Sequence, residues 1–248
     1  MFIDEEAENS FSLPVINQKE KIDIYMSLGG DGTLLYYVSK YNHIEDSKFT
    51  AINFGHLGFM ADIQMEEFNN YIQDIKNGKW KVDERIVLQC ITPHKLEQNS
   101  VNDIVFHRSS IKNMVLLEVS INDQYFNTFQ ADGLIVSTPT GSTAYSLSSG
   151  GPIVHPSLKA FVITPICPHT LTNRPFVIPD SSVIKVKSIN QNDPIAVTID
   201  GVSSFTLSNK DEISIQLSPK TFKLISFHEK GNTFYSTLRT KLGWKGSH

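Results

Sequence analysis

The pattern of hydrophobic and polar positions changes near Trp80. Before that residue, short apolar runs alternate with segments whose apolar residues recur at helical spacing. Apolar runs of this length predict strands, and the helical spacing predicts helices. We therefore expect strands over residues 21–28 and 49–54 and helices over residues 34–41 and 65–77. Strand–helix alternation is typical of a parallel sheet with helices on its faces.

Beyond Trp80, short apolar runs are separated by polar turns, and this pattern favours an all-β sandwich. The predicted strands span residues 86–92, 100–106, 115–121, 133–137, 160–164, 182–186, 194–199, 212–217 and 222–227. Hairpin turns are predicted at residues 121–125 and 208–212, and residues 235–244 are helical or irregular. We predict a doubly wound α/β domain, residues 1–84 completed by residues 228–248, and a C-terminal β-sandwich domain, residues 85–227.

Composition narrows the class of protein. With 40% hydrophobic and 19% charged residues in 248, the chain is globular. A net charge of -4 gives no broad attraction to nucleic acid or to an anionic membrane. The acidic start, MFIDEEAENS, does not resemble a signal peptide. Cys90 and Cys167 lie far apart without CxxC spacing, so we expect a cytoplasmic protein with both cysteines in its core.

The segment GGDGT, residues 29–33, joins the first predicted strand to the first predicted helix. Glycine lets backbone amides approach a ligand, and a helix N-terminus attracts phosphate. Asp31 would repel that phosphate unless a hydroxyl group or Mg²⁺ lies between them. The alternative is that Asp31 is only an N-cap. The segment matches neither the P-loop nor the dinucleotide-binding glycine pattern.

A second unusual segment, residues 131–156, reads ADGLIVSTPTGSTAYSLSSGGPIVHP and carries no charge between Asp132 and His155. Plain surface loops are usually more charged. We therefore favour contact with a polar ligand held by hydroxyl and backbone groups, with Tyr145 as an aromatic face. Asn102 and Asp103 interrupt an apolar strand. Such a pair is ordinarily a turn or a strand edge, but it could also bind an adenine edge and ribose hydroxyls.

These three segments together resemble the NAD kinase family. The resemblance extends to NFGHLGF at residues 53–59, PICPHTLTNRPFVIP at 165–179 and TKLGW at 240–244. It implies an α/β domain followed by a β-sandwich domain. It also implies transfer of the γ-phosphoryl group of ATP to the 2′-hydroxyl of the adenosine ribose of NAD. The expected cofactor is a divalent ion such as Mg²⁺, and the expected assembly is a cytosolic homo-oligomer, often a tetramer.

The resemblance also implies roles for individual residues. Asp31 matches the catalytic aspartate, Asn102 and Asp103 match a pair that contacts adenosine, and Asp132 matches an aspartate near the nicotinamide end. The implied substrate-binding residues are Gly32, Asn102, Asp103, Asp132, Thr143, Ala144, Tyr145, Ser146, Leu147, Ser148 and Asp200, with a phosphate loop of Gly29, Gly30 and Thr33. The chain has Gln130 where the family often has a basic residue, two positions before Asp132.

Two other functions remain open from the sequence. GGDGT also occurs in phosphofructokinases and in diacylglycerol-type lipid kinases, but the sequence shows no membrane-facing apolar or basic segment. A non-catalytic NAD or NADP sensor is the second alternative, favoured by Gln130 and disfavoured by Asp31 and Asp200. Cys167 and His169 do not make a metal site, because structural zinc usually takes four ligands. We predict no metal ligands, and both residues are expected in a pocket or in the core.

Overall fold

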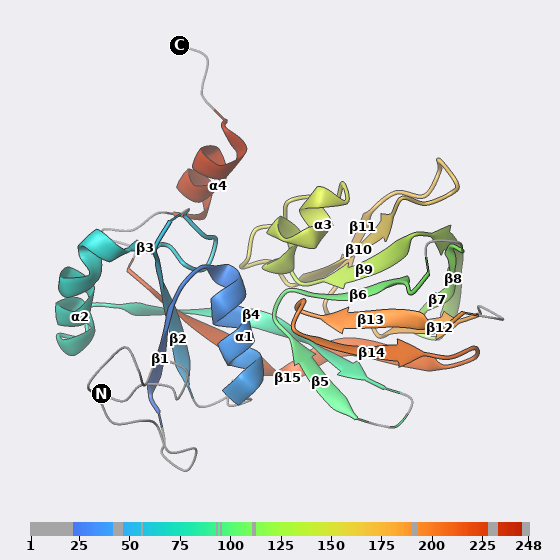
Figure 1. The fold of residues 1–248 in the computed structure, drawn as a ribbon, viewed down its shortest axis with the longest axis horizontal. Helices are drawn as coiled ribbons and strands as arrows, with labels where there is room; N and C mark the ends of the chain where they lie inside the picture. Colours follow the sequence, from blue (N-terminus) through green and yellow to red (C-terminus); the bar gives the residue numbers. More distant parts are fainter. Residues whose placement is uncertain are drawn as a thin grey trace.

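The computed structural model describes residues 22–41, 47–55, 57–92, 94, 96–110, 113–189, 193–227 and 233–244. The N-terminal half is a parallel sheet with a helix on each face (Figure 1). Its elements are β1 (Ile24–Leu28), α1 (Asp31–Tyr41), β2 (Lys48–Asn53), β3 (Ile63–Gln64), the 3₁₀ turn η2 (Met65–Glu67) and α2 (Phe68–Lys76). The alternation predicted from the sequence is confirmed, although the helix expected over residues 65–77 begins as a 3₁₀ turn.

Side chains of β2 explain why the helices cover opposite faces. Phe49 and Ala51 pack in one apolar cluster with α1, whereas Ile52 packs in another with α2. Successive residues of a strand point to opposite faces of a sheet. The N-terminal half is therefore doubly wound, as the sequence predicts.

The C-terminal half is a sandwich of antiparallel strands, and its core is a large apolar cluster that draws on both sheets. The strands are β4 (Lys81–Ile91), β5 (Glu97–Ser100), β6 (Asp103–Arg108), β7 (Val115–Ile121), β8 (Gln124–Ala131), β9 (Gly133–Ser137), β10 (Ala160–Ile166), β11 (Phe176–Pro179), β12 (Ile184–Ser188), β13 (Ile195–Ile199), β14 (Ser203–Leu207) and β15 (Glu212–Ser226). One sheet has the order β11-β10-β9-β6-β13-β14. The sandwich prediction is confirmed.

β15 joins the two halves. The strands predicted at residues 212–217 and 222–227 are one strand, with an irregularity in its pairing to β4 between Leu217 and Thr221. Its first part pairs with β12, and Leu224 pairs in parallel with Phe49 of β2. The other sheet, of nine strands, therefore runs through both halves. Six of its strands follow the order β1-β2-β15-β12-β7-β8, while β3 pairs with β2, β4 pairs with β15, and β5 pairs with β4. The domain boundary at residues 84 and 85 stays a prediction.

The two predicted hairpin turns have different outcomes. Asn122 and Asp123, both at positive φ, connect the paired strands β7 and β8, so this hairpin is confirmed. The hairpin predicted at residues 208–212 is wrong, because β14 and β15 belong to different sheets. The turn there is closed by Asp211, whose Oδ2 accepts a hydrogen bond from the Ser208 amide at 2.8 Å.

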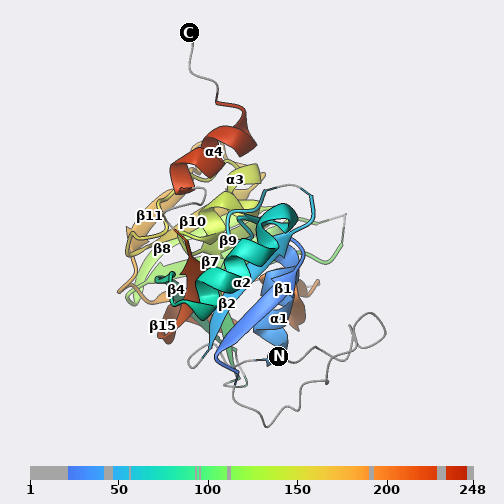
Figure 2. The ribbon, with the colours of Figure 1, turned by 90° about the vertical axis from the view of Figure 1, so that its left-hand side faces the viewer.

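Short helices lie on the side of the molecule where the strands of the parallel sheet end. α3 (Tyr145–Ser148) follows the 3₁₀ turn η3 (Gly141–Thr143), and α4 (Phe234–Leu242) is the last described helix. Figures 1 and 2 both place α4 beside α3, at the end where β1 delivers the chain to α1. None of the helices in the described residues has the length and apolar character needed to span a bilayer.

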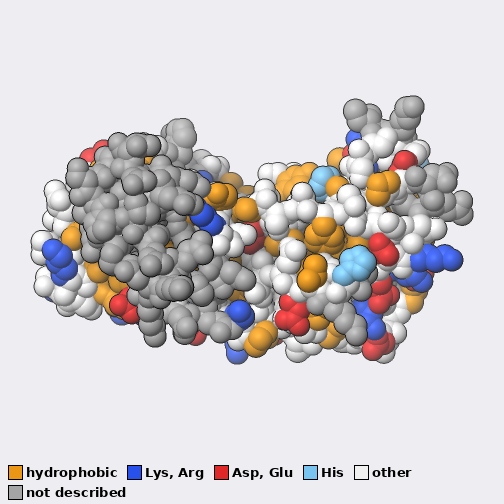
Figure 3. Space-filling view, turned by 60° about the horizontal axis from the view of Figure 1, so that its bottom comes forward, with side chains coloured by type: hydrophobic (Ala, Val, Ile, Leu, Met, Phe, Trp, Pro, Cys, Tyr) orange, Lys and Arg blue, Asp and Glu red, His pale blue; other side chains and the backbone are white. Residues whose placement is uncertain are grey.

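The surface on the opposite side shows no single patch of charge. In Figure 3, acidic, basic and hydrophobic side chains are interspersed over the described part of that face. This mixture agrees with the small net charge of the chain, -4. The side that carries α3 and α4 therefore differs from the face in Figure 3 by its loops and short helices.

Candidate active site

The glycine corner is a tight turn between β1 and α1. Gly29 has φ +151, and a Cβ there would overlap Oγ1 of Thr33 and lie 2.8 Å from its Cβ. The Gly29 amide donates to the Ile52 carbonyl at 2.8 Å, which ties the corner to the end of β2. Only glycine readily adopts this conformation and leaves this space. The corner thus places Asp31 at the first position of α1.

Asp31 is bound by the backbone of a distant loop. Its Oδ2 accepts from the Phe59 amide at 2.8 Å, and its Oδ1 accepts from the amides of Met60 at 3.0 Å and Ala61 at 2.7 Å. A Cβ on Gly58 would overlap Oδ1. The carboxylate therefore orients the loop after β2, a role distinct from the N-cap that the sequence left open. An ionised carboxylate has about four acceptor sites, so one site remains for a ligand.

The Asp200 carboxylate orients the backbone at Asn102 and Asp103, as the Asp31 carboxylate orients the loop after β2. Asp200 lies in the turn between β13 and β14, at φ 50. Its carboxylate accepts from Ser100 Oγ at 2.7 Å and from the amides of Val101, Asn102 and Asp103 at 2.8, 2.8 and 3.1 Å. Burial raises the pKa of Asp200, and these hydrogen bonds act in the opposite direction. Asp200 thus fixes the bend between β5 and β6.

Asn102 is held in that bend with unused polar capacity. Asn102 is 8% exposed, and its Oδ1 is buried without a hydrogen-bond partner among the described residues. A buried unpaired acceptor costs about 1–3 kcal/mol, so a protein that keeps one usually has a functional reason for it. Burial, with a smaller contribution from Asp200, raises the pKa of Asp103 to about 7. The bend is therefore the part of the site that most clearly lacks its partner.

The hydroxyl-rich segment is closed largely on itself. Ser142 Oγ donates to the Pro139 carbonyl at 2.6 Å, Thr143 Oγ1 donates to the Thr140 carbonyl at 3.1 Å, and the hydroxyls of Ser146 and Thr164 lie 2.8 Å apart. Ser146 is fully buried. These hydroxyls support the loop from within, so direct ligand contacts of Thr143, Ala144, Ser146, Leu147 and Ser148 stay predictions.

The same segment is anchored to the Asn102 bend. Thr138 donates its amide to the Asn102 carbonyl at 2.9 Å and its Oγ1 to the Val101 carbonyl at 2.6 Å. A Cβ on Gly141 would overlap the Asn102 carbonyl oxygen. Asn102 and the hydroxyl-rich segment, 30 and more residues apart in the chain, are therefore one unit in space.

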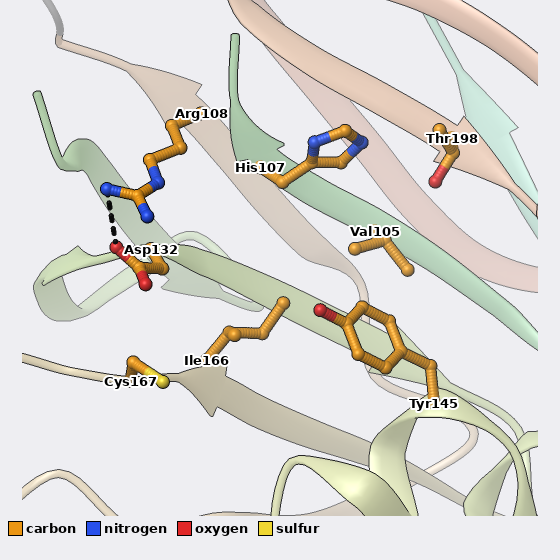
Figure 4. A pocket seen from close by; sticks show the side chains of 8 residues that line it. All are labelled: Val105, His107, Arg108, Asp132, Tyr145, Ile166, Cys167 and Thr198. Atoms are coloured by element: carbon orange, nitrogen blue, oxygen red, sulfur yellow. Dashed lines mark ion pairs between the residues drawn. The ribbon is translucent and has the colours of Figure 1, made fainter. Parts of the chain in front are cut away.

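A pocket of about 460 Å³ lies beside this unit, over the six-stranded sheet (Figure 4). Its lining residues are Val105, His107, Arg108, Asp132, Tyr145, Ile166, Cys167 and Thr198. Tyr145 is 48% exposed, and Figure 4 shows its hydroxyl directed into the pocket. Arg108 Nη1 lies 3.3 Å from Asp132 Oδ1. The pocket brings together Asp132 and Tyr145, two residues predicted to bind the dinucleotide.

The pocket also bears on the predictions for the two cysteines and His169. Cys90 is buried as expected, whereas Cys167 is exposed and lines the pocket at φ 44, so its predicted place in a pocket is confirmed and its place in the core is wrong. His169 is exposed and is not among the pocket residues. Sequence reasoning missed Arg108, because its ion pair with Asp132 depends on the neighbouring positions of β6 and β9 in the sheet. Alternation along β6 from Asp103 would have indicated Val105 and His107, which line the pocket, but it assigns Arg108 to the opposite face.

A shared apolar cluster connects the Asp31 loop to the Asn102 bend. Leu34 of α1, Met60 and Ala61 pack in the same cluster as Val101. Arg85, also buried, pairs with Asp83 at 2.6 Å and donates to Thr140 Oγ1 at 3.4 Å. Burial raises the pKa of Asp62, the residue after this loop, to about 7, with Asp31 as a lesser cause. The two halves of the molecule are therefore packed together at the site.

Comparison with known proteins identifies the family. The ATP-NAD kinase N-terminal domain matches residues 5–80, and the ATP-NAD kinase C-terminal domain matches residues 101–227. An NAD kinase of Protochlamydia amoebophila is 41% identical over 238 residues, which are 96% of this chain and 84% of the relative. An NAD kinase of Clostridium perfringens is 40% identical over 223 residues, covering 89% of this chain and 80% of the relative.

Solved structures agree. A crystal structure of yeast NADH kinase with NADH superposes with a TM-score of 0.84 at 29% identity, covering 97% of this chain and 74% of that chain. The structure of an NAD kinase from Archaeoglobus fulgidus with ATP gives a TM-score of 0.74, covering 96% of this chain and 91% of that chain. At 24% identity, the second likeness concerns the fold alone.

Proposed function

Since the chain belongs to the NAD kinase family, we propose that it transfers the γ-phosphoryl group of ATP to the 2′-hydroxyl of the adenosine ribose of NAD, with Asp31 as the residue that receives the hydroxyl proton. The observation that carries the assignment of Asp31 is its carboxylate, fixed by three backbone amides with one acceptor site left over. A ribose hydroxyl is the donor that this site would accept.

The chemistry limits when Asp31 can act. A free aspartate has a pKa of about 3.9, and a ribose hydroxyl is far less acidic. Asp31 therefore orients the 2′-hydroxyl and accepts its proton only as the new bond to phosphorus forms. Phosphoryl transfer depends mainly on alignment and charge neutralisation. A carboxylate that is already held by the backbone meets the first of these requirements.

The remaining residues are assigned to binding. Asn102 contributes its unpaired amide oxygen to the adenine edge, and Asp103 accepts from a ribose hydroxyl. Asp132 and Tyr145 line the pocket and receive the nicotinamide end. Asp200 supports Asn102 from behind through its three amide contacts. The corner of Gly29, Gly30 and Thr33 is assigned to phosphate, through amides other than that of Gly29, which donates to the Ile52 carbonyl, and Gly32 is assigned to the substrate.

A divalent ion such as Mg²⁺ is proposed to arrive with ATP. The described residues contain no group of three acidic, His or Cys side chains placed to hold a metal. Mg²⁺ keeps several water ligands and is commonly bound through substrate phosphates, so this donor set suits an ion carried by the triphosphate. When bound, the ion would neutralise phosphate charge.

We also propose a cytoplasmic homo-oligomer, with a tetramer favoured. Phe126 and Val177 are 44% and 49% exposed, on strands β8 and β11 at the edges of the two sheets. The rings of Phe126 and Phe176 lie 4.5 Å apart, so the two edges meet in one apolar region. Exposed apolar regions of this kind mark protein contacts. Light scattering on the purified protein gives the mass; a monomer at micromolar concentration would contradict this part of the proposal.

The test of function is direct. The full chain is incubated with NAD, ATP and Mg²⁺, and NADP is measured. Asp31→Asn keeps the size of the side chain but loses the base and, because an NH2 group replaces one acceptor oxygen, at least one backbone contact, so kcat should fall about 10³-fold with a much smaller change in the KM for NAD. Asp23→Asn, an exposed aspartate before β1, is the control. Binding of NAD without turnover would favour the sensor, and unchanged turnover in Asp31→Asn would remove Asp31 from the chemistry.

A further inference from the structure

Helix α4 contacts both halves of the molecule through one side chain. The Phe234 ring centroid lies 6.2 Å from that of Phe59, in the loop after β2, and 5.0 Å from that of His155, in the segment after α3. The ends of α4 are fixed locally. Thr233 accepts from the Ser236 amide at the start, and Gly243 closes the end at φ 64. Phe234 thus occupies the first helical position of a well-capped helix.

Phe59 connects α4 to the carboxylate. Its amide donates to Asp31 Oδ2 at 2.8 Å. Its ring contacts Phe234 and also Lys241, whose Nζ lies 5.2 Å from the ring centroid. A cation at that distance over an aromatic face is attractive. Phe234 and Lys241 of α4 therefore both contact the ring of Phe59. The amide of Phe59 is one of the three that donate to Asp31.

His155 connects α4 to the hydroxyl-rich segment. The neighbouring Val154 donates its amide to Ser142 Oγ at 3.0 Å, and Ser142 Oγ lies 3.1 Å from the Val154 carbonyl. His155 Nδ1 lies 2.7 Å from Ser157 Oγ, so the imidazole is also fixed. The ring that Phe234 contacts on this side is therefore anchored to the segment proposed to bind the dinucleotide.

We propose that Phe234 is a positioning residue for phosphoryl transfer: by packing between Phe59 and His155, it keeps the three amides that orient Asp31 in register with the dinucleotide-binding segment. It does not touch the reacting atoms. The inference rests on the proposed role of Asp31. The structural effect of Phe234, however, is only the stabilisation of residues 59–61. This effect can be measured without turnover.

The experiment compares three variants of the full chain. Phe234→Ala removes the ring, Phe234→Leu keeps an apolar side chain, and Tyr235→Ala is the matched control. Tyr235 is 62% exposed, and its ring centroid lies 5.5 Å from that of His155 and 5.9 Å from that of Phe234. The ring contact with Phe59 is made by Phe234, so Tyr235→Ala removes a neighbouring ring and leaves that contact in place. Hydrogen exchange is followed at the amides of Phe59, Met60 and Ala61, together with kcat and the KM for NAD and for ATP.

In Phe234→Ala, exchange at these amides should become about 10-fold faster and kcat should fall about 10-fold to 100-fold, because an error of about 1 Å in a catalytic group has effects of this size. The KM for NAD should change less than about 3-fold. Phe234→Leu should recover most of both losses. Tyr235→Ala should leave exchange at residues 59–61 as in the parent chain.

Exchange and kcat at parent values in Phe234→Ala would overturn the inference. So would a loss that Phe234→Leu does not recover or that Tyr235→Ala reproduces. If the alanine variant does not fold, the leucine variant decides, with exchange expected to rise about 3-fold and no rise counting against the link. Faster exchange in Phe234→Ala combined with full turnover in Asp31→Asn would support the stabilisation of residues 59–61 by Phe234. The same pair of results would contradict the proposed role of Asp31.

Discussion

Gly58→Ala tests the contact on which the site depends. A Cβ at residue 58 would overlap Asp31 Oδ1, and would lie 2.9 Å from Asp31 Cγ and 3.0 Å from the Ala61 carbonyl oxygen. Neither neighbour is the free end of a long side chain. The carboxylate must therefore rotate away, or the loop must move. Either response separates Asp31 from the amides that hold it.

The magnitude follows from the hydrogen bonds at risk. Oδ1 accepts from two amides, those of Met60 and Ala61. A hydrogen bond to a charged group contributes about 1.5–3 kcal/mol, so loss of both would lower the free energy of unfolding by about 3–6 kcal/mol. Relaxation of the loop recovers part of this, and overpacking alone typically costs about 1–3 kcal/mol. We therefore expect a loss of about 2–4 kcal/mol and, from displacement of the carboxylate by about 1 Å, a fall in kcat of about 10²-fold.

The assay pairs urea unfolding with steady-state formation of NADP. Gly55→Ala is the control in the same loop, because a Cβ there meets no atom within 4 Å. It should keep the stability and kcat of the parent chain. A Gly58→Ala variant that equals Gly55→Ala in both measurements would refute the argument that the Asp31 carboxylate is held by this loop.

Two further predictions concern the binding side. Tyr145→Ala should raise the KM for NAD about 5-fold to 150-fold, since stacking on an aromatic ring contributes about 1–3 kcal/mol; Tyr125→Ala, 65% exposed on β8, is the control, and an unchanged KM would exclude Tyr145 as the aromatic face. Burial, and then Asp200, raise the pKa of Asp103 to about 7, so the folded state binds this proton more tightly than the unfolded state, whose pKa is about 3.9. Stability from this group is therefore present below about pH 4 and falls as the pH rises to about 7, by up to about 4 kcal/mol. Asp103→Asn should flatten the dependence of unfolding free energy on pH between 4 and 7; equal slopes in variant and parent would contradict the assignment.

The sequence predicted the strands whose side chains are buried on pairing and missed several at sheet edges. β7 and β9 match their predicted bounds, because apolar residues mark them and turns end them. β8, β11 and β14 were not predicted. Each has a strand neighbour on one side only along its sheet, so its sequence can stay mixed in polarity. The turn-like residues around Pro219 divided β15 into two predicted strands, whereas the structure absorbs them as a local irregularity.

For the site, local sequence patterns were enough to select Asp31 and Tyr145, and the family resemblance selected Asp132, but neither says what each residue contacts. Asp31 meets residues about 30 positions away, and Asp200 meets residues about 100 positions away. Such contacts depend on strand order and not on local pattern. The same reason explains why Arg108 and Phe234 gave no signal in the sequence, and why NFGHLGF at residues 53–59 did not reveal the contact of Gly58 with Asp31. It also explains why several hydroxyls predicted to contact a ligand form hydrogen bonds within the protein.

The shared strand β15 has a consequence for how the protein can be made and divided. It closes both the sheet behind α1 and the sheet of the sandwich, and it lies near the C-terminal end of the described chain. During synthesis, the sheet of the first half is complete only after residues 212–226 have been made. Pairing over so long a separation in sequence is slow. A fragment that stops at residue 84, or at any point before β15, would expose the edge of β2 to aggregation. Expression of the N-terminal half alone should therefore yield insoluble material unless β15 is supplied in trans.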